Sequence, residues 1–304
     1  MTGSPASDKM KLVVTGSNGF VGRHFCSCYG GVPFTDQDGM VDIRNASRVR
    51  SAIAALMPDA VLHLAAQSSV ASSFNDPAST FSVNLLGTLN LLQALSAAGF
   101  QGVFLYVGSS DVYGRTPEAE LPTKETQRLR PLSPYAVSKV AAEALCYQWS
   151  QTQNFRIVLT RPFPHIGPGQ DKHFAIPNFA HQIVEIRKGI RPPVLVTGDL
   201  DITRDFTDAR DTTRAYRMLL VKGVNGEIYN ICSGQERSLR SMVEELLQIE
   251  GVHAELQVSA ARLRPTEQRR VIGDPARINA LGWAPQIPLR TTLSDVLRYT
   301  EENE

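Results

Sequence analysis

Residues 11–22 read KLVVTGSNGFVG, an apolar run that ends in a turn rich in glycine. A continuous apolar run of this kind is typical of a strand that is covered on both faces of a sheet. Gly16, Gly19 and Gly22 follow with the spacing G-x-x-G-x-x-G, ahead of a short helical segment. Glycine permits a tight turn and lets backbone N–H groups approach a pyrophosphate at the positive end of a helix. The stretch predicts a phosphate-binding turn, and a purely structural turn is the alternative.

An acidic residue stands where a dinucleotide-binding turn would use one. Asp36 lies 20 residues after Gly16, at the end of the segment GVPFTD, residues 31–36. A carboxylate there accepts a hydrogen bond from a ribose hydroxyl and would repel a 2′-phosphate. Pro33 cannot donate to a sheet, so this second strand is expected to be short or near an edge. Because the segment is irregular, the sequence leaves the choice between NAD and NADP open.

Strand and helix patterns alternate along the next part of the chain. The predicted order is helix 45–57, strand 59–66, helix 81–95, strand 102–110, helix 133–151 and strand 155–162. Alternation of this kind implies right-handed crossovers between parallel strands. We therefore expect an α/β fold, a Rossmann-type doubly wound parallel sheet with a smaller C-terminal substrate lobe.

The domain boundary is expected where the pattern loosens after Pro162 and proline and glycine become frequent. We expect an NAD(P)-binding Rossmann domain over residues 11–163 and a mainly substrate-binding lobe over residues 164–304. Residues 223–233 have strand character and are expected to return to the main sheet. Residues 1–10 lack the apolar core of a signal peptide and read as a disordered leader or a cloning remnant.

Composition excludes several classes of protein. The 304 residues are 42% hydrophobic and 20% charged, which suits a globular enzyme with a sizeable core. A net charge of +1 argues against a nucleic-acid binder, which needs a basic surface. No apolar run reaches the roughly 18 residues of a membrane span. We see no metal-ligand set, and we expect four reduced cysteines in a cytoplasmic protein: Cys26, Cys28, Cys146 and Cys232.

A candidate proton-transfer group lies on the predicted helix 133–151. Tyr135 and Lys139 are four residues apart and so share one helix face. An ammonium about 4 Å from the phenolate is worth roughly 4 kcal/mol at an effective dielectric of 20, which would bring the tyrosine pKa from about 10 towards 7. Ser109 ends a predicted parallel strand, where ligands bind in open α/β sheets. Alone, a Tyr-x-x-x-Lys pair is usually a surface pair. Its occurrence together with the glycine turn and the polar strand end is poorly explained by chance.

Four motifs together resemble one family. They are TGSNGFVG (residues 15–22), HLAAQSSV (63–70), SSDVYG (109–114) and PYAVSK (134–139). From about Lys11 to the C-terminus, the chain resembles the extended short-chain dehydrogenases/reductases, in the branch that acts on nucleotide sugars. The resemblance implies a nicotinamide cofactor, NADP or NAD, on the Rossmann domain. It also implies a nucleoside diphosphate sugar held by the C-terminal lobe.

The resemblance and the residue patterns together assign candidate roles. Ser109, Tyr135 and Lys139 occupy the family's catalytic positions, and Asp111 is a fourth catalytic candidate. The residues expected along the cofactor are Gly16, Gly19, Phe20, Val21, Gly22, Asp36, Asp42, Ile43, Leu64, Ala65, Ala66, Tyr135 and Lys139. The residues expected to meet the substrate are Ser110, Asp111, His165, Arg204, Arg264 and Glu267.

Arginines near the C-terminus could grip a diphosphate, because their planar fork suits phosphate oxygens. Four of them lie within the nine residues 262–270, and at least two are expected to be solvated surface charges. By family likeness Arg264 would meet phosphate and Glu267 the ribose hydroxyls. Arg204 is a further phosphate candidate, with a structural ion pair to a neighbouring aspartate as its alternative.

Asp111 bears on the direction of the chemistry. The 4,6-dehydratases of the family carry a glutamate there, which removes the proton at sugar C5. Aspartate is one methylene shorter, and a base must come within hydrogen-bond reach of its proton. This argues against dehydration and leaves capping as an alternative role for Asp111. The short segment between Gly22 and Asp42 also resembles the sugar reductases of the family.

The chain most resembles the GDP-6-deoxy-D-mannose reductases. The motifs that carry this resemblance are SSDVYG, SPYAVSK, RPFPHIGPGQ (apart from its second proline, Pro164), RDFTD and IYNICSGQE. These enzymes make GDP-D-rhamnose from GDP-4-keto-6-deoxy-D-mannose, a route towards cell-surface polysaccharide. The resemblance implies that the nicotinamide delivers hydride to C4 while Tyr135 protonates the oxygen. One departure is Pro164, where the family has an asparagine that contacts the substrate. Proline has no side-chain donor, so neighbours such as His165 would have to supply that contact.

Other functions stay open on sequence grounds. Within enzymes they are a GDP-mannose 4,6-dehydratase and a nucleotide-sugar 4-epimerase; outside them, a non-catalytic nicotinamide-binding sensor. The segments 81–95 and 133–151 are apolar beyond one stripe, as expected for helices buried in a core or an interface. Family members pair these helices across a dimer, so a homodimer is expected, with no nucleic-acid or membrane partner.

Overall fold

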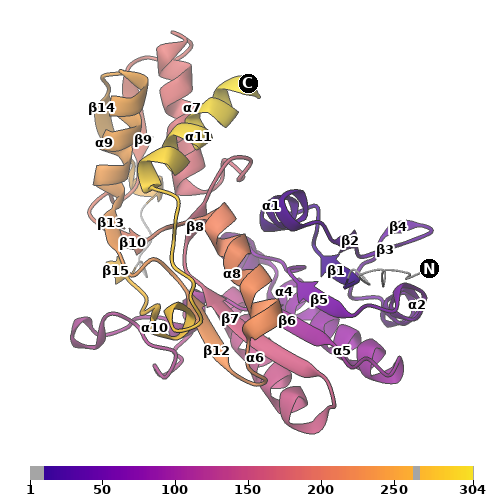
Figure 1. Ribbon diagram of the computed structural model, residues 1–304. Coiled ribbons are helices and arrows are strands. Elements are labelled where there is room, and N and C mark those ends of the chain that lie inside the picture. The colour runs from indigo at the N-terminus through magenta and orange to yellow at the C-terminus, as the bar shows by residue number, and fades with distance from the viewer. Residues whose placement is uncertain (1–9, 263–267, 304) are drawn as a thin grey trace, which may run out of the picture.

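Figure 1 shows a parallel sheet flanked by helices, with a second lobe above its carboxyl-terminal edge. The computed structural model describes residues 10–262 and 268–303. All neighbouring strands of the main sheet are parallel. Their order is β12 (Ile228–Ile231), β7 (Arg156–Pro162), β6 (Val103–Val107), β5 (Ala60–His63), β1 (Leu12–Thr15) and β2 (Val32–Pro33). The order reverses between β1 and β5, which is where such sheets bind ligands.

Helices cover both faces of the sheet. One face packs on α2 (Ala46–Leu56), α5 (Gly87–Ala97) and α6 (Pro134–Thr152). The other packs on α1 (Phe20–Tyr29), α8 (Ala209–Lys222) and α10 (Ala276–Asn279). Side chains alternate between faces along a strand, so on β1 Val13 joins the first layer and Leu12 and Val14 join the second. The predicted Rossmann-type doubly wound sheet is confirmed.

The second strand is reduced, as Pro33 predicted. β2 holds two residues at the sheet edge, where the missing proline N–H breaks no ladder. The chain then forms a separate antiparallel hairpin from β3 (Thr35–Asp36) and β4 (Gly39–Met40). Asp36 therefore lies on the hairpin and not on a strand of the main sheet.

The predicted helix 81–95 is present, but it contains a π-helical turn. The chain forms α3 (Val70–Asn75), α4 (Pro77–Phe81), a π-helical turn (Ser82–Leu86) and then α5. A π turn carries an extra residue and is frequent near functional sites. Asn84 of this turn is buried, and its amide bonds Ser138 of α6 and both backbone groups of Gln67. The π turn therefore ties the loop after β5 to the helix that carries Tyr135.

The second lobe has its own apolar core, drawn mainly from three helices: α7 (Ala175–Arg187), α9 (Leu239–Glu250) and α11 (Leu289–Glu302). Its small sheets are β9 (Val194–Thr197) with β14 (Glu255–Val258), and β10 (Thr203–Asp205) between β13 (Glu236–Ser238) and β15 (Arg270–Val271). β8 (His165–Ile166) and β11 (Thr207–Asp208) pair where the lobes meet. Short 3₁₀ turns are Ser110–Tyr113, Glu118–Glu120 and Ala260–Arg262.

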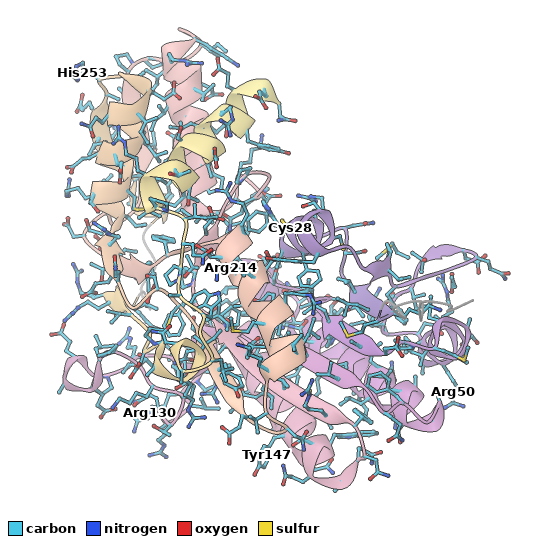
Figure 2. The ribbon with its side chains drawn as sticks, viewed as in Figure 1. Cys28, Arg50, Arg130, Tyr147, Arg214 and His253 are labelled. Carbon is cyan, nitrogen blue, oxygen red and sulfur yellow. The ribbon has the colours of Figure 1, made fainter. Side chains whose placement is uncertain are left out.

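Two further features concern the described part of the chain. The four cysteines are free, and Figure 2 places exposed Cys28 on α1 at the molecular surface. Among the described helices, we find none with the length and apolar character needed to traverse a bilayer. The leader predicted over residues 1–10 lies, apart from Met10, outside the described residues.

Candidate active site

The glycine turn after β1 is shaped by close backbone contacts. Gly16 has φ of +69°, and a Cβ there would lie 2.8 Å from the backbone nitrogen of Ala65. A Cβ on Gly22 would lie 2.2 Å from the carbonyl oxygen of Gly16. Real side chains do not make such contacts, and a positive φ disfavours other residues. The turn therefore requires glycine at both positions and brings α1 and the loop after β5 close to β1.

Within the described part of the chain, the glycine turn offers hydrogen-bond donors without partners, as a phosphate site requires. Gly19 caps α1 without a side-chain hydrogen bond, so the first N–H groups of the helix are open to an anion. The hydroxyl of Ser17 is buried and has no partner among the described residues. The residues predicted along a cofactor gather here: Phe20 and Val21 begin α1, and Leu64, Ala65 and Ala66 follow β5.

The residues predicted at the adenosine end have partners of their own. Arg48 of α2 donates from Nε and a terminal nitrogen to the two carboxylate oxygens of Asp36, at 2.8 and 2.6 Å. Hydrogen bonding by Arg48 lowers the pKa of Asp36. Asp42 is bound in the same way by Arg44, which lowers its pKa. The side chain of Ile43 is buried in the core.

Ser109, Tyr135 and Lys139 converge beyond the carboxyl end of β6. All three are largely buried, with exposed fractions of 9%, 8% and 6%. Ser133 caps α6 and Pro134 occupies its first turn, which fixes where the helix begins. The Nζ of Lys139 donates to the carbonyl oxygen of Val107 at 2.8 Å and lies 6.0 Å from the ring centre of Tyr135. The geometry brings together the three side chains that the sequence singled out.

The predicted lowering of the tyrosine pKa is wrong for this structure. Burial raises the pKa of Tyr135, the charge of Asp111 raises it further, and a hydrogen bond from Ser109 acts in the opposite direction. The ammonium of Lys139 does not offset these effects, because it is directed to the Val107 carbonyl. Tyr135 therefore stays a neutral phenol at and well above pH 7, which is the form that can donate a proton.

Burial also acts on the lysine, lowering the pKa of Lys139 from its ordinary 10.5 to about 8. If charged Lys139 is needed for turnover, kcat/KM will fall as the pH rises above about 8. Stability should change in the opposite sense: between pH 8 and 10.5 the unfolded chain binds the additional proton, so this residue makes the free energy of unfolding rise with pH. Both pH profiles are measurable, and Lys139→Met should remove this rise in stability. A kcat/KM that stays constant from pH 7 to about 9.5 would contradict the assignment.

A cavity opens at Ser110 and Asp111, which directly follow Ser109 in the chain. A recess of about 20 Å³ is walled by Ser110, Asp111 and Phe163, among others. It adjoins a wider cavity of about 290 Å³ through shared residues that include Arg270. Arg115 and Arg269 also line the wider cavity. The small recess has room for about one water-sized group, such as a sugar hydroxyl, and the wider cavity, lined by three arginines and Glu118, carries a net basic lining that suits an anionic group.

The predicted substrate residues are only partly gathered at this cavity. Ser110 and Asp111 line it, whereas His165 stacks on Phe20 beside the glycine turn, with ring centres 6.1 Å apart. Burial lowers the pKa of His165. Arg204 donates to the carbonyl oxygens of Thr203 and Gln268. Arg264 and Glu267 lie outside the described residues.

Sequence reasoning missed three polar residues near the trio. Arg115 lines the wider cavity, is exposed, and forms no hydrogen bond or ion pair with other described residues. Glu143 and Arg161 form a buried ion pair at 2.6 Å. Glu143 was detectable, because it lies four residues after Lys139 on the same helix face. Arg115 follows SSDVYG directly, but nothing in its sequence context predicts a cavity.

Comparison with known proteins gives three results that agree on the family of this chain. The family model described as GDP-mannose 4,6 dehydratase matches residues 39–296. A GDP-6-deoxy-D-mannose reductase of Pseudomonas aeruginosa is 46% identical over 94% of this chain and 96% of its own length. A human dTDP-D-glucose 4,6-dehydratase is 33% identical over 81% of this chain and 69% of its own length.

Solved structures agree with these sequence matches. The RMD protein of Pseudomonas aeruginosa, solved in complex with NADPH, superposes with a TM-score of 0.92 at 43% identity, over 97% of this chain and 100% of that one. A UDP-glucose 4-epimerase of Thermus thermophilus, solved with NAD, gives a TM-score of 0.83 at 28% identity, over 96% and 99% of the two chains. The family resemblance predicted from the motifs is confirmed. The chain belongs to the GDP-mannose 4,6 dehydratase family, within the extended short-chain dehydrogenases/reductases.

Proposed function

We propose that this protein is an NAD(P)H-dependent reductase that converts the C4 ketone of GDP-4-keto-6-deoxy-D-mannose to the alcohol of GDP-D-rhamnose. The observation that carries the proposal is the convergence of Ser109, Tyr135 and Lys139 beside the recess walled by Asp111. Whole-length similarity to a GDP-6-deoxy-D-mannose reductase supports the choice of substrate. The similar structure solved with NADPH favours that form of the cofactor.

The cofactor would be held by the Gly16–Gly22 turn, the loop from Leu64 to Ala66, and Lys139. When bound there, the reduced nicotinamide supplies the hydride that reaches C4. The N–H groups at the start of α1 and the Ser17 hydroxyl would bind its phosphates. Lys139 is anchored by one hydrogen bond to Val107 and keeps two donors for ribose hydroxyls.

Tyr135 acts as the general acid at O4 of the sugar. Its phenol is neutral near pH 7, and burial raises its pKa further, so it carries the proton that the developing alkoxide needs. Ser109 lies beside the phenol, where it lowers the pKa of Tyr135, and would orient the same oxygen. A proton donor placed in this way contributes about 10²- to 10⁴-fold to the rate. Asp111 would contact the sugar from the wall of the recess.

The basic cavity next to the recess would take the nucleotide diphosphate. Arg269 and Arg270 are already paired with Asp199 and Glu236, so their net charge is partly neutralised. Arg115 has no such partner among the described residues and is exposed to the cavity. We assign it to a phosphate oxygen, in addition to Arg204 and to Arg264, which lies outside the described residues.

Two incubations test the reductase proposal, each followed by nicotinamide absorbance and product chromatography. One contains GDP-mannose and no added cofactor; the other contains GDP-4-keto-6-deoxy-D-mannose with NADPH or NADH. Stoichiometric oxidation of the cofactor in the second alone supports the proposal, and the C4 configuration of the product names the sugar. Formation of a keto-sugar in the first would instead show a dehydratase with Asp111 as its base.

A homodimer through α5 and α6 is part of this proposal. Val137 and Ala144 are exposed apolar residues seven positions apart on one face of α6, and Figure 2 shows Tyr147 at the outer edge of the same helix. A second copy would cover these apolar side chains. Such a reductase would act in the cytoplasm and supply an activated sugar for cell-surface polysaccharide.

Ala144→Arg is expected to convert the dimer to a monomer, because the interface would have to bury an unpaired charge. Light scattering coupled to gel filtration should show the mass fall by half. Val221→Arg, at an exposed apolar position on α8, should leave the mass unchanged. A wild-type protein that elutes as a monomer would contradict the dimer.

A further inference from the structure

Each nitrogen of the Arg161 side chain, on β7, has a hydrogen-bond partner in the interior. Its Nε and one terminal nitrogen bind the two carboxylate oxygens of Glu143 at 2.8 and 2.6 Å. Its other terminal nitrogen donates to the Tyr113 hydroxyl at 3.0 Å and to the carbonyl oxygen of Glu125 at 2.9 Å. Arg161 is 3% exposed and Glu143 5%. A bidentate pair of this kind is geometrically specific, so Glu143 fixes where the guanidinium can lie.

Tyr113 is held by this arginine and by one further group. Its hydroxyl accepts from Arg161 and donates to Oδ1 of Asn230 on β12 at 2.6 Å. Its ring lies 4.8 Å from the guanidinium carbon of Arg161. The side chain is 3% exposed and packs against Phe163. Both hydrogen-bonding capacities of the phenol are used, so its position is tightly defined.

Tyr113 ends the short 3₁₀ turn Ser110–Tyr113, which Ser109 caps. The hydroxyl of Ser109 accepts from the backbone nitrogen of Asp111 at 3.2 Å. Gly114 follows with φ of +60°, and a Cβ there would lie 1.7 Å from the carbonyl oxygen of Arg130. The turn is therefore fixed at its far end by Tyr113 and Gly114. A displacement of that end must move Ser109 and Asp111, because only a few residues separate them.

The contacts that run from Tyr113 through Arg161 end at Glu143, which lies on α6, the helix that carries Tyr135 and Lys139. Glu143 lies four residues after Lys139 and eight after Tyr135 on α6. The ion pair with Arg161 therefore connects α6 to the turn that carries Ser109, through Tyr113. Ser109 and Tyr135 come from different elements, so the approach of the Ser109 hydroxyl to the Tyr135 phenol, which lowers the pKa of Tyr135, depends on how those elements are placed.

We propose that Tyr113 is a positioning residue for the reaction: held by the buried Arg161–Glu143 pair, it sets the Ser109 hydroxyl against the Tyr135 phenol. The inference rests on the proposed reductase function, in which Tyr135 gives up its proton. Tyr113 also lines the recess, but its hydroxyl is taken up by Arg161 and Asn230 and so is not offered to the substrate oxygen. Its contribution is the alignment of Ser109, and small misplacements at a reacting centre have large effects on rate.

Tyr113→Phe is the sharpest test, because it removes one hydroxyl and keeps the ring in the core. We expect kcat with the keto-sugar to fall by about 10- to 100-fold. The Kd for NADPH, measured by fluorescence, should stay within about twofold, since Lys139 and the glycine turn are untouched. Tyr229→Phe is the matched control: Tyr229 is also buried, and its hydroxyl accepts from Val224 away from the turn. This control should keep wild-type kcat.

A double variant separates positioning from a general loss of stability. If Tyr113 acts through Ser109, then in a Ser109→Ala background Tyr113→Phe should lower kcat by less than about twofold. Multiplicative effects would overturn the proposal, as would wild-type kcat in Tyr113→Phe alongside an active wild-type enzyme.

Hydrogen exchange gives a readout that does not depend on turnover. In Tyr113→Phe, peptides covering residues 108–114 should exchange at least about fivefold faster, the effect of losing one net hydrogen bond. Peptides from α6 should be unchanged. Unchanged exchange at 108–114 would overturn the positioning role of Tyr113. A wild-type enzyme without turnover would instead overturn the reductase proposal, and the exchange result alone would then decide whether Tyr113 fixes the turn.

Discussion

Tyr135→Phe is expected to reduce kcat for the keto-sugar by about 10²- to 10⁴-fold, the range attributed to a placed proton donor. The substitution removes the phenol, which is neutral near pH 7 and lies beside Ser109. The aromatic ring stays, so the packing of α6 should be preserved. The Kd for NADPH should change by less than about threefold, because the phosphate turn and Lys139 are intact. Single-turnover oxidation of bound NADPH is the direct measurement.

Tyr147→Phe is the control for this variant. It makes the same change on the same helix, at a side chain that is 52% exposed and outside the cavity. It should keep wild-type kcat. Retention of more than about a tenth of the wild-type kcat in Tyr135→Phe would remove Tyr135 from the general-acid role and direct attention to Asp111 or to water.

The parts of the site that sequence could predict are those set by local geometry. The glycine turn follows from spacing, because Gly16 and Gly22 sit where a Cβ would collide with neighbouring backbone. Tyr135 and Lys139 follow from helical periodicity, and Ser109 from its place at the end of a parallel strand. Each of these inferences needs only a few consecutive residues and the type of element that holds them.

The parts that sequence could not predict depend on contacts between distant segments. Lys139 donates to Val107, 32 residues earlier in the chain, so its effect on the Tyr135 pKa was overestimated. The partner of Asp36 is Arg48, from the next helix, and no spacing rule indicates that pair. The π turn at Ser82–Leu86 is stabilised by Asn84 contacts with Gln67 and Ser138. An apolar pattern alone reads through such a turn as a continuous helix.

Glu143→Gln is expected to lower the free energy of unfolding by about 3–5 kcal/mol, the cost of leaving a buried charge without its partner. The guanidinium of Arg161 is 3% exposed and would keep its charge in the interior. Urea denaturation followed by circular dichroism gives the measurement. Asp201→Asn, which breaks the exposed Arg240–Asp201 pair, is the control and should cost no more than about 1 kcal/mol.

The double variant Glu143→Met with Arg161→Met tests whether the loss in Glu143→Gln comes from the unpaired charge. Replacing both members of a buried pair by apolar residues of similar size is often neutral for stability. The double variant should therefore be more stable than Glu143→Gln, although it leaves the Tyr113 hydroxyl without its donor. Its kcat should remain low, since α6 and the Ser109 turn are no longer joined through Arg161. Recovery of stability without recovery of turnover would separate the two roles of this ion pair, and recovery of both would reduce it to a structural contact.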